Sequence, residues 1–466
     1  MGLKIIFEQS EKANQNYLTK IVKIDNLRPH PNPEVTRLDI ITVNGSDIIV
    51  GRGSVKVGDV VVYCPCESAL NLEFLRENNQ FRDIEMNRVP DKKKCGFFEN
   101  KGRVKAISLK GVISTGFIFP VEWLNIWQAD LTIKNIEDYI DVSFDTVNGK
   151  LFSKKYVIRQ QRKPVIGDGK KRVKRNNRLQ RFDKLIKNQF SFHYDTGKLA
   201  DQVFTIDPDD VLSITTKYHG TSVIISNVLV NKELKWHEKL LKRFGVDINT
   251  QEYDYLYSSR GVIKNRYINK NAGSGFYSVD VWTVAGERLK EFLHKGMTVY
   301  AEIVGYLPST DTFIQKNHDY KCKVGEFEIY VYRITQTNVD GEVYEFSAKQ
   351  IQNWCKSRDI KPVKELYYGK AKDVYPDLST KQHWHQNFVN KLANDKERFY
   401  MEVNSPDCCN EVPHEGIVIR NDSTGYNALK LKTKRHFLME TAELDSGEAD
   451  IETMEETEAE IADFPQ

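Results

Sequence analysis

The sequence lacks several patterns that would assign it quickly to a class of protein. No apolar run approaches the ~20 residues that a helix needs to cross a bilayer, and the N-terminus lacks the apolar core of a signal peptide. The phosphate-binding pattern Gly-x4-Gly-Lys-Ser/Thr does not occur. These gaps argue against a membrane-spanning protein and against a P-loop nucleotidase.

Cysteine is scarce and poorly placed for binding a metal. Seven cysteines are scattered along the 466 residues, and neither Cys64-Pro65-Cys66 nor Cys408-Cys409 has the two-residue spacer of a zinc knuckle. We therefore expect no structural zinc, and we interpret the odd number of thiols as reduced. Reduced thiols indicate an intracellular, cytoplasmic protein.

The charges are distributed unevenly, although the formal net charge is only +3. Residues 154–187 contain fourteen Lys or Arg and two acids, whereas residues 440–466 contain eleven Asp or Glu and no Lys or Arg. A run this basic attracts a phosphate backbone, so we expect it to contact RNA, although a solvated linker has the same composition. The acidic end is typical of a disordered tail.

Composition and length are those of a globular protein with two or three domains, since 40% of the residues are hydrophobic and 11% aromatic. Residues 1–125 predict an all-β domain. Leu18–Ile24 reads as a strand, and Arg37–Val43 follows a Pro-rich break and turns at Asn44-Gly45. Short strands at this spacing favour a small oligonucleotide-binding (OB) barrel. Residues 126–200 would then form a basic, RNA-contacting linker.

Lys217 lies in a predicted turn between two strands. The segments 211–216 and 221–225 are both rich in β-branched residues, which predicts strands, and Gly220 stands in the turn between them. A lysine in such a turn is held on a rigid frame while its ammonium group enters a cleft. We predict that Lys217 is the nucleophile of the chain, although ordinary surface turns also carry Lys and Gly.

Four segments further along the chain carry related chemistry. Residues 428–432 alternate strictly, which places Lys430 and Lys432 on one face of a strand. Two lysines side by side repel each other unless an anion such as a nucleotide phosphate lies between them. The other three segments are a strand at 298–305 with Glu302, an aromatic strand at 327–334 with Tyr330 and Tyr332, and a strand at 414–420 that begins near Glu415.

These five segments in this order resemble the signature of the covalent nucleotidyltransferases, the superfamily of ATP-dependent ligases and mRNA capping enzymes. The likeness covers about residues 200–437. The Lys-x-His-Gly-Thr form of the first segment resembles RNA ligases of the phage and RNA-editing type, which leaves a phage-encoded protein open. DNA ligases and capping enzymes usually carry Lys-x-Asp-Gly there. About residues 18–124 resemble the barrel that precedes the catalytic domain in one group of RNA ligases.

The resemblance implies an α+β fold. An N-terminal OB-like β-barrel is followed by a nucleotidyltransferase domain of the ATP-grasp-like ligase type over residues 201–440, built on mixed and antiparallel sheet. An acidic, disordered tail over residues 441–466 ends the chain. The expected partner is RNA, with no membrane, and we expect a monomer.

The implied activity is that of an ATP-dependent RNA ligase in RNA repair, which joins 3′-hydroxyl and 5′-phosphate ends through lysyl-AMP and RNA-adenylate intermediates. Lys217 would attack the α-phosphorus of ATP. Lys430 and Lys432 would hold the α-phosphate as point charges. An amine attacks only when it is neutral, and nearby cations favour that form.

The resemblance also implies a metal ion, Mg²⁺ or Mn²⁺, held by Glu302 and Glu415. Mg²⁺ usually binds through one or two carboxylates together with substrate phosphate and several waters. Glu302 is otherwise a lone acid in an apolar strand, which costs stability unless the carboxylate has a partner. An ordinary charge at the edge of a sheet is the alternative.

The remaining implied roles concern the nucleotide. Tyr332 would stack on adenine, although Tyr330 lies on the same strand face and stays an alternative; the family usually has Asp where this chain has Arg333. His219, which replaces the more common aspartate, would contact phosphate or only order the turn. Residues also assigned to nucleotide binding are Thr216, Gly220 and Arg260, the last from an arginine-bearing motif that can bind the ribose or the 3′-terminal nucleotide.

Two competing interpretations remain open. A DNA ligase or capping enzyme normally carries a barrel after its last lysine motif, whereas only about thirty residues follow Lys432 here. The second is an RNA-binding protein with an inactive nucleotidyltransferase domain. Loss of activity would have eroded the candidate lysines and glutamates, and all of them are present.

Overall fold

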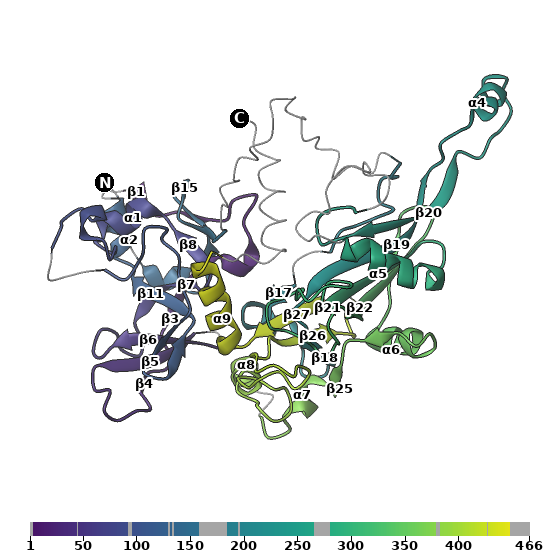
Figure 1. Ribbon diagram of the computed structural model, residues 1–466. Helices are drawn as coiled ribbons and strands as arrows, with labels where there is room; N and C mark the ends of the chain where they lie inside the picture. The colour runs from purple at the N-terminus through teal and green to yellow at the C-terminus, as the bar shows by residue number, and fades with distance from the viewer. Residues whose placement is uncertain are drawn as a thin grey trace, which may run out of the picture.

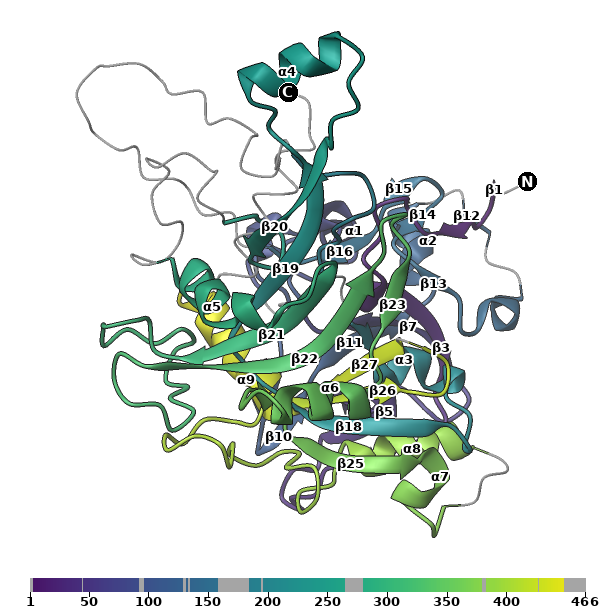
Figure 2. The same cartoon turned by 90° about the vertical axis from the view of Figure 1, so that its right-hand side faces the viewer.

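The computed structural model describes residues 3–43, 45–91, 96–128, 131–132, 135–157, 184–193, 196–264, 280–378, 383–425 and 427–447. Two β-rich bodies lie side by side, and the last described helix, α9 (Lys434–Asp445), lies between them (Figures 1 and 2). Most of the basic run and most of the acidic tail fall outside the described residues. No described helix combines the length and apolar character needed to span a membrane.

The first body contains the predicted barrel. One sheet has the order β11-β7-β3-β13 and a second the order β4-β5-β6, and their apolar faces form two adjoining cores. The elements of these sheets and their helices are β3 (Thr19–Lys23), β4 (Arg28–Pro29), β5 (Leu38–Val43), β6 (Ser46–Gly51), β7 (Val60–Pro65), β11 (Gly116–Pro120), β13 (Ser143–Phe144), α1 (Leu72–Glu77) and α2 (Trp123–Trp127).

Short strands extend this body beyond the boundary at residue 125 that the sequence suggested. β13 pairs with β3, and β16 pairs with β8, so residues 143–155 belong to the barrel rather than to a separate linker. The short strands are β1 (Leu3–Lys4), β2 (Phe7–Glu8), β8 (Ser68–Leu70), β9 (Ile107–Leu109), β10 (Val112–Ser114), β12 (Leu131–Thr132), β14 (Thr146–Val147), β15 (Lys150–Leu151) and β16 (Ser153–Lys155).

The second body is built on two sheets. A five-stranded sheet has the order β17-β27-β26-β18-β25, and a six-stranded sheet the order β20-β19-β21-β22-β23 with β24 beside β22. The strands are β17 (Gly197–Lys198), β18 (Val211–Lys217), β19 (Thr221–Asn231), β20 (Gln251–Ser258), β21 (Met297–Gly305), β22 (Phe327–Thr337), β23 (Val343–Glu345), β24 (Lys361–Pro362), β25 (Glu365–Lys370), β26 (Gly416–Asn421) and β27 (Asn427–Lys432).

Helices cover the two sheets and close their cores. α5 and α6 bring Trp282 and Trp354 into the core of the six-stranded sheet, and α8 brings Trp384 into that of the five-stranded sheet. The α+β fold expected from the sequence is therefore present. The helices of this body are α3 (Leu199–Gln202), α4 (Trp236–Arg243), α5 (Val281–Leu289), α6 (Ala348–Lys356), α7 (Ala371–Val374) and α8 (Trp384–Leu392).

α9 links the two bodies through polar contacts. Thr441 Oγ1 donates to Glu67 Oε1 over 3.1 Å, and the Asp445 carboxylate accepts from Arg103 Nη1 over 3.1 Å. At the other end of the helix, Lys434 Nζ lies 2.7 Å from Asp47 Oδ2. Residues 441–445, which the sequence placed in the acidic tail, are therefore helical and in contact with the barrel.

Candidate active site

A cavity of about 310 Å³ opens where the barrel, the two sheets and α9 meet. All ten residues that the sequence singled out for catalysis, nucleotide or metal line this one cavity. They are Thr216, Lys217, His219, Gly220, Arg260, Glu302, Tyr332, Glu415, Lys430 and Lys432. The lining also includes residues with no assigned role, among them Tyr17, Lys155, His193, Lys198, Phe437 and Glu440.

Lys217 is the last residue of β18 and pairs with Gly416, the first residue of β26. This register brings Lys217 beside Glu415, which directly precedes Gly416. The Lys217 ammonium donates to Glu415 Oε1 over 2.6 Å. The lysine side chain is 24% exposed, whereas that of Glu415 is 2% exposed. The reactive candidate can therefore be reached from the cavity, while its partner is fixed beneath it.

The turn after Lys217 is held by Glu302 of β21. The Gly220 amide donates to Glu302 Oε1 over 3.0 Å, and the His219 amide donates to Tyr320 Oη over 2.7 Å. A Cβ at position 220 would lie 2.2 Å from the carbonyl oxygen of Ile303, so the turn packs too closely on β21 for any residue larger than glycine. Glu302 thus orders the loop that carries the lysine, a contact that the sequence did not suggest.

One half of the cavity holds lysines that are paired with buried carboxylates. Lys432 Nζ lies 2.6 Å from Glu440 Oε1 and 3.3 Å from Glu415 Oε1. Burial opposes ionisation of all three groups, but the attraction among them is larger. The pKa of Glu415 is held well below its usual range by Lys217 and Lys432, and that of Glu440 by Lys432 and His436. The pKa of Lys432 is raised by Glu440 and Glu415.

The other half of the cavity centres on Lys430. Lys430 stands opposite Lys198 of β17 and makes no ion pair with any described residue. Burial, followed by the charges of Lys432, Lys217 and Arg260, lowers the pKa of Lys430 well below its ordinary value. Burial and nearby cations, Arg333 first, also lower the pKa of His193 to about 3. This half of the cavity therefore favours an anion.

The structure separates the two candidate stacking residues. Tyr332 lines the cavity, and its hydroxyl oxygen lies 3.0 Å from the Ser222 hydroxyl oxygen. Tyr330 stacks on Tyr218 with ring centroids 4.2 Å apart and does not line the cavity. Only Tyr332 is thus placed to meet a ligand. Arg333, where the family usually has Asp, pairs with Glu345 on the neighbouring β23.

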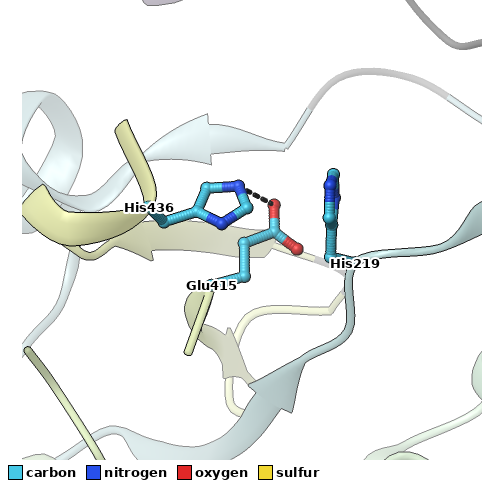
Figure 3. A group of neighbouring side chains, drawn as sticks. All are labelled: His219, Glu415 and His436. Atoms are coloured by element: carbon cyan, nitrogen blue, oxygen red, sulfur yellow. Dashed lines mark ion pairs between the residues drawn. The ribbon is translucent and has the colours of Figure 1, made fainter. Parts of the chain in front are cut away.

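His219, Glu415 and His436 form a compact group that suits a metal ion. Figure 3 shows the two imidazole rings on opposite sides of the Glu415 carboxylate, and one ligand atom from each residue lies within 4.8 Å of the others. All three residues are buried, and Glu415 Oε2 and His436 Nδ1 make no hydrogen bond to a described residue. His436 Nε2 lies 3.2 Å from Glu440 Oε1 and 3.6 Å from Glu415 Oε1. Two nitrogens and one carboxylate oxygen suit a first-row divalent ion such as Zn²⁺ or Mn²⁺ better than they suit Mg²⁺.

This group differs from the metal pair expected from the sequence. Glu415 belongs to it, but the second predicted ligand, Glu302, does not; among the described residues, no group of three close metal-ligating atoms includes Glu302. Sequence reasoning missed both His436 and Glu440 of α9. Their spacing of four residues, directly after the last lysine motif, places both on one helix face and was the available signal.

Comparisons with known proteins agree with this geometry. Residues 210–432 match the family model described as RNA ligase, and residues 18–121 match the model of an OB-fold domain. No curated protein sequence matches the chain. The second match covers nearly the same residues as the stretch, about 18–124, that resembles a ligase barrel in the sequence.

The fold is similar to solved structures of the RNA ligase of Naegleria gruberi. A ligand-free mutant has a TM-score of 0.51 at 13% identity and covers 92% of this chain and 99% of its own. The same enzyme with pyrophosphate has a TM-score of 0.50 at 13% identity, covering 92% and 100%. A mutant with ATP and Mn has a TM-score of 0.50 at 14% identity, covering 90% and 98%. At 13–14% sequence identity, the similarity to these structures supports a shared fold and nothing more.

Proposed function

We propose that this chain, whose residues 210–432 belong to the RNA ligase family and stand behind an OB-fold domain, uses ATP to join 3′-hydroxyl and 5′-phosphate RNA ends. The observation that carries the proposal is the position of Lys217. It shares one cavity with Lys430, Lys432, Arg260 and Tyr332, which together offer a nucleophile, cations for phosphate and a ring for the base.

In the first step the Lys217 amine attacks the α-phosphorus of ATP. The new bond joins nitrogen to phosphorus, the bond to the pyrophosphate oxygen breaks, and the nitrogen loses one proton to solvent and keeps one in the phosphoramide. Glu415 Oε1, 2.6 Å from Nζ, orients the amine. Lys430 receives the phosphate charge, because an anion supplies the attraction that its buried site otherwise lacks.

The second and third steps transfer the adenylate and seal the strand. An oxygen of the RNA 5′-phosphate attacks the adenylate phosphorus and displaces Lys217. The 3′-hydroxyl oxygen of the other strand then attacks the RNA phosphorus and releases AMP. Positioning and charge neutralisation dominate such transfers. Arg260 and Lys430 are the cations placed for this role.

A divalent metal ion fits at the wall of the same cavity, where His219 and Glu415 line it and His436 lies behind them. His219, Glu415 and His436 would hold it, and when bound it supplies positive charge that favours the neutral form of the Lys217 amine. The Naegleria gruberi ligase structures that carry ATP with Mn, or AMP with Mn, support the choice of ATP and Mn²⁺. Mg²⁺ is a poorer match to two imidazole nitrogens.

Incubation with labelled ATP or GTP and Mn²⁺, followed by ligation of matched RNA and DNA ends, tests the proposal. We expect label from ATP on the protein and joining of RNA. Label from GTP alone would favour capping chemistry, and equal joining of DNA would favour a DNA ligase. A protein that binds RNA but takes no label would be an inactive relative.

A further inference from the structure

A two-stranded arm projects from the edge of the six-stranded sheet and carries α4 at its tip (Figures 1 and 2). β19 and β20 pair without interruption from Ile224 opposite Ser258 to Asn231 opposite Gln251. No residue of α4 is buried, and no residue from 231 to 250 lines the catalytic cavity. The helix is therefore carried away from the body without adding to its core.

One face of this tip is apolar and exposed. Trp236, Leu240 and Phe244 follow one another at intervals of four residues, which places them on one side of the helix. Trp236 is 77% exposed, Phe244 75% and Leu240 46%. An exposed apolar stripe with two aromatic rings lowers the solubility of a protein. Such a surface usually marks a binding site.

A basic stripe runs beside the apolar one. Lys235, Lys239, Lys242 and Arg243 are exposed and form no ion pair with any described residue. Two of the three acids at residues 231–250 pair with lysines: Glu238 Oε1 lies 2.5 Å from Lys232 Nζ, and Glu233 Oε2 lies 3.8 Å from Lys184 Nζ. Asp247 is the third acid, so the four exposed cations leave a net positive charge at the tip.

We propose that this arm binds unpaired nucleotides of the RNA substrate outside the catalytic cavity, an inference that rests on the proposed function. Exposed aromatic rings stack on bases, and adjacent cations hold the backbone, which is how proteins bind single strands without reading their sequence. A duplex keeps its bases stacked inside the helix, so the rings at positions 236 and 244 suit a single strand. The net positive charge of the tip attracts the negative backbone of RNA more strongly than it attracts a protein surface with few acidic residues.

The test measures binding of a fluorescent single-stranded RNA and of a blunt RNA duplex by anisotropy, without ATP, using the full chain. Stacking contributes about 1–3 kcal/mol per base, so we expect W236A/F244A to weaken single-strand binding at least about tenfold while duplex binding changes little. In K239A/R243A the salt slope of single-strand binding should fall by about 1.4 units, since each lost phosphate contact removes about 0.7. F204A, which removes a ring that is 71% exposed elsewhere, is the matched control.

Formation of the AMP adduct is measured on the same variants, and the arm variants should keep it because the arm does not line the cavity. Single-strand binding that is unchanged in W236A/F244A would overturn the inference. So would light scattering that shows a wild-type dimer and a monomeric variant, because the stripe would then be an interface between copies. A wild type that binds RNA through the arm but forms no adduct would sink the proposed ligation and leave the arm intact.

Discussion

The two halves of the cavity place lysines of the same strand in opposite environments. Lys430 and Lys432 lie two residues apart on one face of β27, but only Lys432 meets buried carboxylates. Carboxylates neutralise the charge of Lys432, whereas Lys430 makes no ion pair with any described residue and has the charges of Lys432, Lys217 and Arg260 nearby. We interpret the surroundings of Lys432 as part of the folded framework, and under the proposed function Lys430 receives the phosphate of a ligand.

The largest effect should come from removing the nucleophile itself. Lys217→Ala should abolish both the AMP adduct and the joining of RNA, because no other amine in the cavity has the same position at the end of β18. Labelled ATP followed by gel electrophoresis measures the adduct. Lys361→Ala, which removes an exposed lysine paired with Glu328, is the control. A Lys217→Ala protein that seals RNA not adenylated beforehand would contradict the assignment.

Stability should separate the two lysines of β27. Lys432→Met removes the lysine partner of Glu440 and one of the two lysine partners of the buried Glu415, and breaking a buried pair costs about 3–5 kcal/mol of unfolding free energy. Lys430→Met removes a half-buried charge that makes no ion pair with any described residue, so the protein should be as stable as the wild type or more so. Urea unfolding measures both. An equal loss of unfolding free energy in the two variants would contradict the proposed difference between the surroundings of Lys430 and Lys432.

The pH dependence of stability should carry the same contrast. The pKa of Lys430 is lowered in the folded state, so above that pKa the unfolded chain binds more protons and stability rises with pH up to about 10.5, the ordinary lysine value. The pKa of Lys432 is raised, so its contribution is full below 10.5 and is lost at higher pH. Urea unfolding from pH 7 to 10 should show a smaller rise in Lys430→Met than in the wild type. An identical rise in both would remove Lys430 as the cause.

The smallest effect concerns metal choice. Mn²⁺ should support adduct formation better than Mg²⁺, because the metal group contains two imidazoles. His436→Asn should reduce the ratio of the Mn²⁺-supported rate to the Mg²⁺-supported rate several-fold. His385→Asn alters a histidine that contacts the Ile206 carbonyl instead and should leave the ratio unchanged. A ratio that survives in His436→Asn would remove α9 from the metal group.

The ten candidate residues chosen from the sequence all line one cavity. For those on strands, the alternation of side chains predicts which residues share a face of the sheet. Alternation predicted that Lys430 and Lys432 share a face, and it placed Tyr330 and Tyr332 together as well. A period of two cannot choose between those tyrosines. The choice depends on the stack of Tyr330 on Tyr218, a contact between β22 and a turn about 110 residues earlier in the chain.

Other features escaped prediction for physical reasons. Glu440 was counted with the acidic run of residues 440–466 because composition cannot distinguish a solvated acid from one that is paired with a lysine. The barrel boundary was placed too early because β13 to β16 are two or three residues long, too short for a periodic pattern. The role of Glu302 in holding Gly220 depends on how β19 and β21 pair, which becomes visible only in the folded sheet.

The most direct test of the account is to locate the adenylate. The protein is incubated with ATP and Mn²⁺, digested under conditions that preserve the phosphoramide bond, and mapped by mass spectrometry. We expect one AMP group per chain, on Lys217. AMP on Lys430 or Lys432, or a protein that takes no AMP at all, would contradict it.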